Sequence, residues 1–355
     1  MANRAHFDVS RRWWEKSRRA RGNLDFAEFT DSTASLAGWL LRPDQPIDRV
    51  AVYLDDHLLG EQAVDHRQDL ARLFGHVRHA GSSGFAVAGG FRAAGEDFVS
   101  VSVVGLPRRG ERFLLQYYRL TAPEPLDRLP PAHLRKRVAG TDDPKVFIDS
   151  GADNALQFIG YLGKHLEARA APRVLDWGCG PGRMARYLLR FWPEAALTGC
   201  DIDAEAVEWC GRELRPGAFR ATGPFPPLPF GDGGFDAVVG YSVMTHLPWP
   251  LQERWLSEIR RVLVPGGVFA TSVQGSFAAS LTPGLPARLK RAGILDETPD
   301  SALDGVAPPG YYRAVFQTPA FTRERWGRGF EVLDYVEGGL SALHDLVVLR
   351  RLADP

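Results

Sequence analysis

The residues best suited to do chemistry in this chain lie in segment 174–183, which reads Val-Leu-Asp-Trp-Gly-Cys-Gly-Pro-Gly-Arg. Two apolar residues end a predicted strand, and Asp176 lies at its carboxyl tip. Glycines let the following backbone turn tightly and approach a ligand that a side chain would block. A helix predicted to start at the end of this segment would offer its unpaired N–H groups to the same ligand. The predicted ligand-binding residues of the loop are Gly178, Cys179, Gly180, Gly182 and Arg183.

A second acid follows at the end of the next predicted strand. Residues 196–203 read Ala-Leu-Thr-Gly-Cys-Asp-Ile-Asp, and a helical pattern begins at position 204. In nucleotide-binding βαβ units, an acid about 20 residues past the glycine loop binds ribose hydroxyls. Asp201 fits that role because a carboxylate can accept both hydrogen bonds of a cis-diol. Ile202 is placed to pack against adenine or in the core, and Asp203 is interpreted as a cofactor contact or a helix cap.

Together these segments resemble the cofactor region of class I S-adenosylmethionine-dependent methyltransferases, whose loop reads hydrophobic-Asp-x-Gly-x-Gly-x-Gly. Segment 228–248 resembles the fourth-strand region of the same family, and segment 264–273 resembles its proline-glycine turn into the fifth strand. The even glycine spacing departs from the dinucleotide pattern Gly-x-Gly-x-x-Gly, which disfavours a nicotinamide-dependent dehydrogenase. The four matches cover roughly residues 170–273 in the family's order.

The resemblance implies an α/β fold, a Rossmann-like domain with a mostly parallel seven-stranded sheet whose last strand is antiparallel. It also implies S-adenosylmethionine as the cofactor. Many relatives contact the adenine amino group with an acid after the third strand, but the region 220–226 has no acid there. Thr222 or backbone groups would have to replace that contact.

The chemistry of such a cofactor indicates where the acceptor binds. A sulfonium methyl group is already activated, so its transfer is an in-line displacement governed mainly by positioning. An amine or carboxylate acceptor could react without a dedicated base, whereas a hydroxyl gains from one. Ligands bind beyond the carboxyl ends of strands in open α/β sheets, and Tyr241 and His246 follow the fourth strand. His246 is the predicted general base, and its alternative role is to support the entry of the next helix.

The long segment 275–312 follows the fifth strand and is rich in proline and glycine. Because long ordered insertions are usually functional, we expect it to form much of the acceptor site. Tyr311 and Tyr312 are its predicted acceptor-binding residues, although aromatic packing also explains them. Together with His344 they are weaker candidates for the base.

The amino-terminal part of the chain has a different pattern of apolar residues. Short β-type runs separated by turn signals occur at 36–41, 50–54, 85–88, 98–104 and 113–120. Strands at this spacing, with no helix between them, predict a small antiparallel sandwich. Segments 67–71 and 81–85 look similar to β-sandwich modules found beside bacterial glycosyltransferases and surface-glycan enzymes.

These patterns predict four segments along the chain. A basic amino-terminal segment covers residues 1–30, the sandwich covers 31–121, and the methyltransferase domain covers 146–355. Five prolines predict that the intervening linker, 122–145, has no regular structure.

Composition narrows the classes of partner. Basic and acidic residues balance at 43 each, so no nucleic acid is expected as a partner. Three cysteines indicate neither a disulfide framework nor a zinc site, and no metal is expected. The absence of a long apolar run and of a signal-peptide core predicts a cytoplasmic protein without a membrane span. Segment 10–22 is basic with two tryptophans, which predicts either a solvated tail or a peripheral contact with an anionic membrane or nucleic acid.

The sequence therefore predicts a cytoplasmic methyltransferase that methylates a sugar or glycan hydroxyl, with a role in polysaccharide biosynthesis. This acceptor depends mainly on the analogy of the sandwich module. Two alternatives stay open. One is methyl transfer to another small molecule or a lipid, and the other is a non-catalytic glycan-binding assembly protein with a degenerate methyltransferase fold. The sequence leaves the oligomeric state open.

Overall fold

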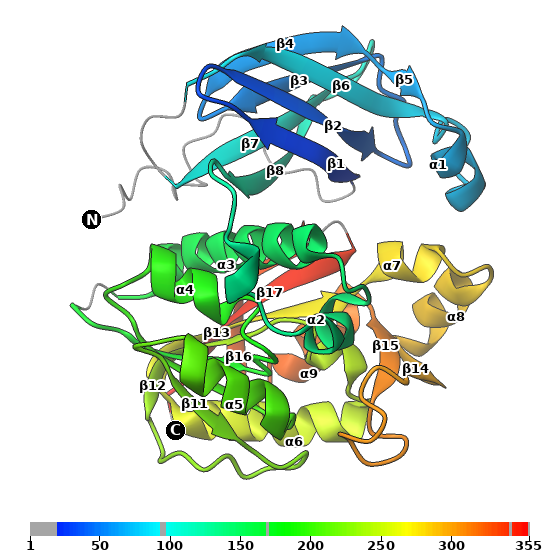
Figure 1. Ribbon diagram of the computed structural model, residues 1–355. Coiled ribbons are helices and arrows are strands. Elements are labelled where there is room, and N and C mark those ends of the chain that lie inside the picture. The colour runs from blue at the N-terminus through cyan, green and yellow to red at the C-terminus, as the bar shows by residue number, and fades with distance from the viewer. Residues whose placement is uncertain (1–19, 93–96, 168–169, 341–342, 354–355) are drawn as a thin grey trace. The chain divides into compact units, whose positions relative to one another are not determined.

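The structure is a computed structural model that describes residues 20–92, 97–167, 170–340 and 343–353. The chain divides between Glu124 and Pro125 into two compact units (Figure 1). No helix in these described ranges is long and apolar enough to cross a membrane. The basic segment 10–22, predicted to be a solvated tail or a peripheral contact, lies almost entirely outside the described ranges.

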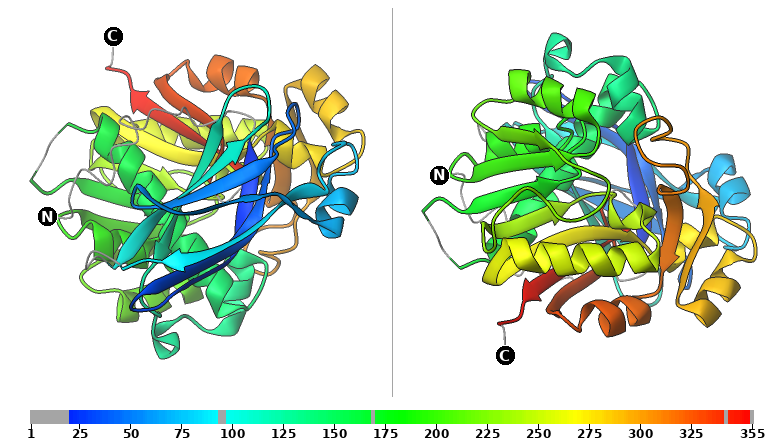
Figure 2. Two further views of the ribbon diagram at one scale, coloured as in Figure 1. Left: turned by 90° about the horizontal axis from the view of Figure 1, so that it is seen from above. Right: turned by 90° about the horizontal axis from the view of Figure 1, so that it is seen from below.

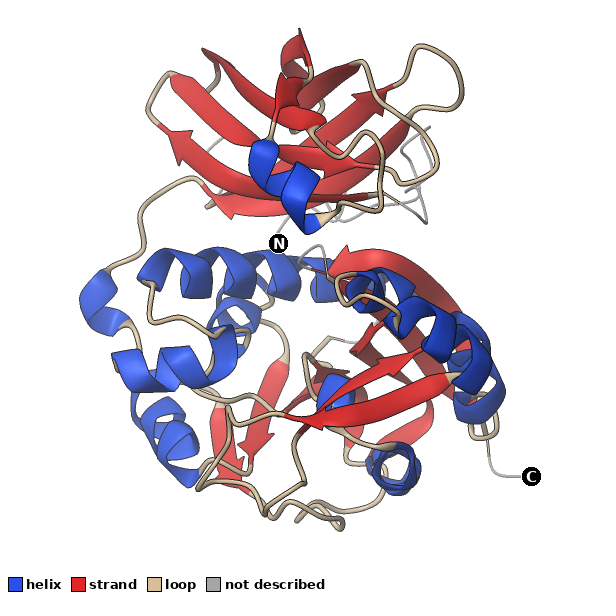
Figure 3. Cartoon of the chain, turned by 90° about the vertical axis from the view of Figure 1, so that its right-hand side faces the viewer, coloured by secondary structure: helices blue, strands red, loops and turns tan. Residues whose placement is uncertain are grey.

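The first unit consists of two four-stranded antiparallel sheets and the short helix α1 (Gln68–Leu73) (Figure 3). One sheet has the order β1 (Arg21–Phe29), β2 (Thr33–Leu41), β6 (Ser82–Gly90) and β5 (Asp65–His66). The other has the order β4 (His57–Ala63), β3 (Arg49–Leu54), β7 (Phe98–Leu106) and β8 (Phe113–Leu120). A buried cluster that includes Leu40, Val52, Phe85, Val101 and Phe113 draws residues from both sheets. The predicted all-β sandwich is therefore confirmed.

The sequence placed the start of this unit too late. Strand β1 falls within the segment 1–30 that was predicted to be a basic tail, and it pairs along its whole length with β2. The reason is that β1 has few large apolar residues and depends on this pairing. Its Leu24 is buried, while the neighbouring Asp25 and Phe26 are exposed.

The predicted linker also has more regular structure than expected. It contains the 3-10 turn η2 (Leu126–Arg128) and helix α2 (Ala132–Ala139), and helix α3 (Pro144–His165) begins before the linker's predicted end. Pro131 precedes α2 directly, and Pro144 lies in the first turn of α3. Proline is favourable at these positions because its missing N–H would have no partner there. These prolines start helices rather than prevent them.

The second unit is built on a mixed sheet with helices on both faces (Figure 2). Its main strand order is β11, β10, β9, β12, β13, β17 and β16. Strands β11 to β13 run parallel, and β17 is antiparallel to both of its neighbours. The bounds are β9 (Arg173–Trp177), β10 (Ala196–Asp201), β11 (Ala218–Ala221), β12 (Phe235–Gly240), β13 (Leu263–Gln274), β16 (Phe330–Leu340) and β17 (His344–Arg351). The predicted Rossmann-like sheet with an antiparallel last strand is therefore confirmed.

A hairpin extends this sheet beyond the expected seven strands. Strands β14 (Ile294–Pro299) and β15 (Arg313–Gln317) pair with each other, and β15 joins the end of β13 through Gln274 and Phe316. The helices of the unit, besides α2 and α3, are α4 (Ala185–Phe191), α5 (Ala204–Glu213), α6 (Trp249–Val262), α7 (Ser276–Ser280), α8 (Leu285–Ala292) and α9 (Pro319–Trp326), with the 3-10 turn η3 (Met244–His246).

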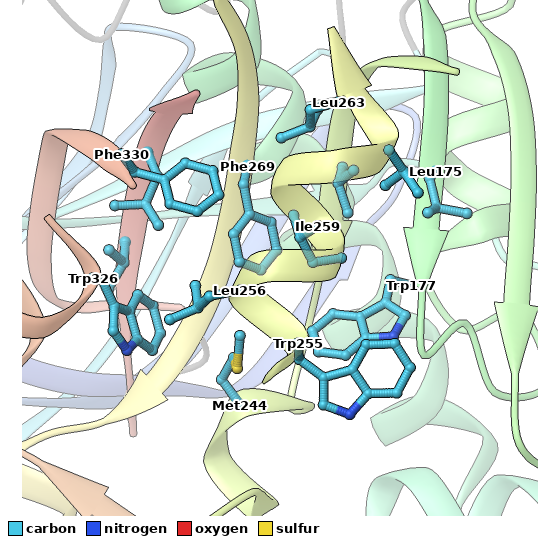
Figure 4. Packing of buried hydrophobic residues seen from close by; sticks show 14 of the residues in the cluster. Leu175, Trp177, Met244, Trp255, Leu256, Ile259, Leu263, Phe269, Trp326 and Phe330 are labelled. Atoms are coloured by element: carbon cyan, nitrogen blue, oxygen red, sulfur yellow. The ribbon is translucent and has the colours of Figure 1, made fainter. Parts of the chain in front are cut away.

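Helix α6 buries one face against the sheet. Its buried residues Leu251, Trp255, Leu256, Ile259 and Val262 recur at helical spacing, as the sequence predicted. They pack in a cluster with strand residues, in which the rings of Trp177 and Trp255 lie 5.0 Å apart (Figure 4). This packing fixes the carboxyl ends of β9 and β12, where the cavity described below opens.

Candidate functional site

The loop after β9 has the backbone that its glycines predict. Gly178, Gly180 and Gly182 all have positive φ angles, of 76°, 51° and 76°. A Cβ atom at Gly178 would lie 2.3 Å from Val243, and one at Gly182 would lie 2.3 Å from Leu214. Glycine at these positions therefore lets the loop pack against the turn after β12 and against the end of α5.

Asp176 ends β9 as a buried acid without a hydrogen-bond partner. Its side chain is 1% exposed, and neither carboxylate oxygen has a partner. Burial raises the pKa of Asp176 to about 7, and the nearby charge of Asp201 acts in the same direction, whereas Arg183 opposes it. Such a group gains by meeting a cationic donor in the cavity that it lines.

Arg183 lies on the same cavity and supplies the opposite charge. Its guanidinium lies 4.7 Å from the ring centroid of Tyr241, which is a cation–π distance. Together, Asp176 and Arg183 offer one anion and one cation to a ligand. The α-ammonium and α-carboxylate of an amino acid match that pair.

Asp201 ends β10 and holds the glycine loop. Its Oδ2 accepts a hydrogen bond from the Gly180 N–H at 2.7 Å, and its Oδ1 accepts one from the Asp203 N–H at 2.8 Å. Each oxygen keeps a second lone pair for a ligand hydroxyl. Burial raises the pKa of Asp201, although these two N–H donors act to lower it.

Asp203 takes the role of a helix cap. Its carboxylate accepts a hydrogen bond from Ala206 N–H at the start of α5, and it accepts another from Arg137 at 2.8 Å. The cap interpretation is therefore confirmed, and Asp203 lies on the cavity wall as well. Ile202 and Thr222 also line the cavity, and the Thr222 N–H donates to the carbonyl of Asp201 at 2.8 Å.

The turn after β12 forms the opposite wall. Tyr241, Ser242 and Val243 line the cavity there, and Ser242 has a positive φ of 60°. From the insertion 275–312, the lining residues are Leu303, Tyr311 and Tyr312. Helices α7 and α8 contribute no lining residue. The insertion therefore contributes its last part, rather than its bulk, to this wall.

His246 lies behind this wall and is not a lining residue. Its Nδ1 donates to the carbonyl of Arg313 at 3.1 Å, and its Nε2 lies 3.3 Å from Ser242 Oγ. Its ring stacks on Tyr312 with 3.8 Å between centroids. Burial lowers the pKa of His246 to about 4, while the charge of Asp300 and the Arg313 carbonyl act to raise it. The imidazole is therefore neutral at pH 7.

The other candidate bases are less well placed. Burial raises the pKa of Tyr311 to about 12 and raises that of Tyr312 as well, so both stay protonated at neutral pH. The ring of His344 lies 5.4 Å from that of Tyr241. Burial lowers the pKa of His344 to about 3, with smaller contributions from His246 and Arg183.

Most of the residues predicted from the sequence meet in one cavity. The lining includes Asp176, Gly178, Cys179, Gly180, Arg183, Asp201, Ile202, Thr222, Tyr241, Tyr311 and Tyr312. Gly182, His246 and His344 lie outside the lining. Gly182 instead packs closely against the side chain of Leu214.

Several lining residues were not predicted. Arg137 and Val138 belong to α2, which was treated as linker, and a helical pattern ending at Gly140 is the signal that could have identified them. Ser242 was missed because serine after a strand is common, and its backbone conformation is visible only in the structure. Trp177 and Trp255 line the cavity as well, and both belong to the core cluster described above.

Comparisons with known proteins agree with this geometry. Residues 174–267 match a family model described as a methyltransferase domain. The chain is similar to a fatty-acid O-methyltransferase of Mycolicibacterium smegmatis, with 40% identity over 98 residues, which are 27% of this chain and 35% of that protein. It is also similar to a trans-aconitate 2-methyltransferase of Mycobacterium tuberculosis, with 27% identity over 228 residues, 60% of this chain and 81% of that protein.

A solved structure is also similar. It is that of the Burkholderia thailandensis 1,6-didemethyltoxoflavin-N1-methyltransferase with bound 1,6-didemethyltoxoflavin and S-adenosylhomocysteine, at 18% identity and a TM-score of 0.42. The match covers 67% of this chain and 96% of that one. On the family match, the strand order and the glycine loop, residues 174–267 are part of a methyltransferase domain, and S-adenosylmethionine is its cofactor.

Proposed function

We propose that the protein methylates an oxygen atom of a small organic acceptor by in-line displacement. The observation that carries this proposal is the single cavity that joins the glycine loop and Asp201 to the turn after β12. One wall offers groups suited to the cofactor, and the other offers aromatic and hydroxyl side chains suited to an acceptor. S-adenosylmethionine, when bound, supplies a sulfonium methyl group that is already activated.

The residues divide this work according to their chemistry. Asp176 and Arg183 hold the ammonium and carboxylate of the cofactor's amino-acid end. Asp201 accepts hydrogen bonds from the ribose hydroxyls. Ile202 and Thr222 contact the adenine. The remaining loop contacts come from Gly178, Cys179 and Gly180, whose backbone approaches the ligand closely.

The acceptor lies beside Tyr241, Tyr311 and Tyr312. The two relatives named above act on a fatty acid and on trans-aconitate, which supports a small-molecule or lipid acceptor. The sugar or glycan hydroxyl predicted from the sequence stays part of the proposal as one kind of oxygen acceptor. The analogy of the sandwich module has no support from these comparisons, so a role in polysaccharide biosynthesis and a cytoplasmic location are proposed on the sequence alone.

A non-catalytic assembly protein is not favoured. A degenerate cofactor site would have no need of a buried, unpaired Asp176, which is costly to the fold without a ligand. The hydrogen bond from Gly180 to Asp201 likewise keeps the loop in its binding conformation.

Calorimetric titration with S-adenosylmethionine, S-adenosylhomocysteine and NAD tests the cofactor. The wild type should bind the first two at micromolar Kd and should not bind NAD. Asp201→Ala should weaken binding at least tenfold, which corresponds to about 1.4 kcal/mol. Asp127→Ala is the matched control, since Asp127 is exposed and does not line the cavity.

Transfer of tritium from methyl-labelled S-adenosylmethionine to a panel of fatty acids, di- and tricarboxylates, and glycosides tests the acceptor. In the calorimetric titration, binding of NAD in preference to S-adenosylhomocysteine, or equal cofactor affinity in wild type and Asp201→Ala, would contradict the proposal.

A further inference from the structure

Ser242 is held in an unusual backbone conformation on the cavity wall. Its φ of 60° lies in the left-handed region that a serine rarely adopts. Its N–H donates to Ser272 Oγ at 2.7 Å, and this bond fixes the turn. Non-glycine residues held in this region are strained, and they cluster at functional sites. The conformation places the Ser242 hydroxyl between the cavity and His246.

The tautomer of His246 is set by its other ring nitrogen. Because the Arg313 carbonyl can only accept, Nδ1 carries the hydrogen, and neutral Nε2 has a lone pair. That lone pair faces Ser242 Oγ at 3.3 Å. The Thr245 hydroxyl also lies 3.3 Å from Ser242 Oγ. Thr245 can donate to Ser242, which leaves the Ser242 hydrogen free for the imidazole.

A carboxylate lies behind the imidazole. Asp300 Oδ2 is 3.5 Å from His246 Nδ1, and Asp300 Oδ1 accepts a hydrogen bond from Ala302 N–H at 2.9 Å. Tyr312, which stacks on the ring, and His344 are the other titratable groups that face His246. Ser242, His246 and Asp300 thus form a line from the cavity to a negative charge.

We infer that Ser242 and His246 form a proton relay for a hydroxyl acceptor, with Ser242 as the catalytic residue that touches the acceptor. The inference rests on the proposed function and narrows its acceptor to an alcohol or phenol. A carboxylate acceptor is already ionised at neutral pH and would have no use for the relay.

The relay balances atoms and charge. The acceptor oxygen bonds to the methyl carbon while the carbon–sulfur bond breaks and leaves a neutral thioether. The acceptor's proton passes to Ser242 Oγ, and the proton of Ser242 passes to His246 Nε2. One positive charge therefore moves from sulfur to imidazole. The sulfonium that opposes protonation of His246 disappears in the same step, and Asp300 then stabilises the imidazolium.

Nuclear magnetic resonance of nitrogen-15-labelled histidine tests the relay without an acceptor. In protein saturated with S-adenosylhomocysteine at pH 7, His246 should be neutral with its hydrogen on Nδ1. The signal is assigned by its loss in His246→Asn, whose amide can still donate to Arg313. Ser242→Ala should shift the Nε2 resonance, whereas Ser257→Ala, on the exposed face of α6, should not. A hydrogen on Nε2, a charged ring at pH 7, or no shift in Ser242→Ala would overturn the relay.

Kinetics provide the second readout, with octyl β-D-glucoside as the hydroxyl probe and decanoate as the carboxylate probe. Ser242→Ala and His246→Asn should each lower kcat for the glucoside at least 100-fold, with S-adenosylhomocysteine affinity unchanged within twofold. Wild-type kcat should fall as the pH drops toward 4, where His246 becomes protonated. Turnover of decanoate alone, or a glucoside kcat that Ser242→Ala leaves intact, would contradict the relay.

The two proposals fail differently. A wild-type protein that does not bind S-adenosylhomocysteine contradicts the proposed function. One that binds it but shows the wrong His246 tautomer contradicts the relay alone. If neither probe is methylated, the nitrogen-15 measurement of the His246 tautomer decides whether the relay is present.

Discussion

Asp176 illustrates how a functional residue can weaken the fold that carries it. An ionised carboxylate with no hydrogen-bond partner is expensive to bury, and this one lies at the end of a central strand. Without a ligand, the protein relieves part of this cost by raising the pKa of Asp176 to about 7. Cofactor binding at neutral pH should therefore be coupled to loss of a proton.

The first prediction concerns stability as a function of pH. The folded-state pKa of Asp176 is above its unfolded value, so the folded state binds more protons between about pH 4 and 7. Its contribution to the unfolding free energy is present below pH 4 and is lost as the pH rises through 7. Asp176→Asn removes this loss, so the variant should gain on the order of 2–4 kcal/mol relative to wild type between pH 4 and pH 8. Urea unfolding at both pH values measures it, and a constant difference between the two proteins would contradict the assignment.

At the scale of elements, α2 and the N-cap of α5 line one side of the cavity. Arg137 on α2 donates to Asp203 and Glu205 at 2.8 and 3.0 Å. Val138 packs so close to the glycine loop that a Cβ at Gly180 would lie 2.8 Å from it. The helix is thus tied to the start of α5 by ion pairs and to the loop by packing.

The second prediction is that Arg137→Ala changes ligand retention more than stability. Partly exposed ion pairs contribute about 0–1 kcal/mol, so the melting temperature should fall by no more than a few degrees. The Kd for S-adenosylhomocysteine should rise several-fold because α2, which lines the cavity, loses its ion pairs to Asp203 and Glu205. Calorimetry and thermal unfolding measure the two effects. Lys136→Ala, at an exposed position on the same helix, should change neither, and equal effects of both substitutions would contradict the role of Arg137.

The same elements mark what sequence could predict here and what it could not. The glycine loop and Asp201 were predictable because nucleotide-type binding loops need particular residue types at a fixed spacing. Helix α2 was not, because five prolines nearby suggested a linker and their positions at helix starts appear only in the fold. His246 was assigned correctly to the turn after β12. Its distance from the cavity, with Ser242 between, depends on a backbone angle that residue types do not specify.

At the scale of the molecule, the cavity belongs to one unit. Every lining residue falls between Arg137 and Tyr312, and the chain divides before Pro125.

The third prediction follows from this division. A fragment of residues 125–355 should fold and bind S-adenosylhomocysteine with a Kd within about threefold of the whole chain. Circular dichroism and calorimetry test both statements. A folded fragment that has lost binding would mean that the sandwich supports the cavity, and an unfolded fragment would contradict the division into units.

The three cysteines can report when the cofactor edge of the sheet opens. Cys179, Cys200 and Cys210 are free and buried, and they lie on the glycine loop, at the end of β10 and on α5. The hydrogen bond with Cys210 and burial raise the pKa of Cys179, and burial raises the pKa of Cys200, so neither forms the reactive thiolate while the fold is closed. Because all three side chains are buried, an alkylating reagent should react with them mainly when this edge of the sheet opens. The rate at which the reagent adds mass to these cysteines would measure how often the cofactor edge of the sheet opens. A bound ligand would lower that rate.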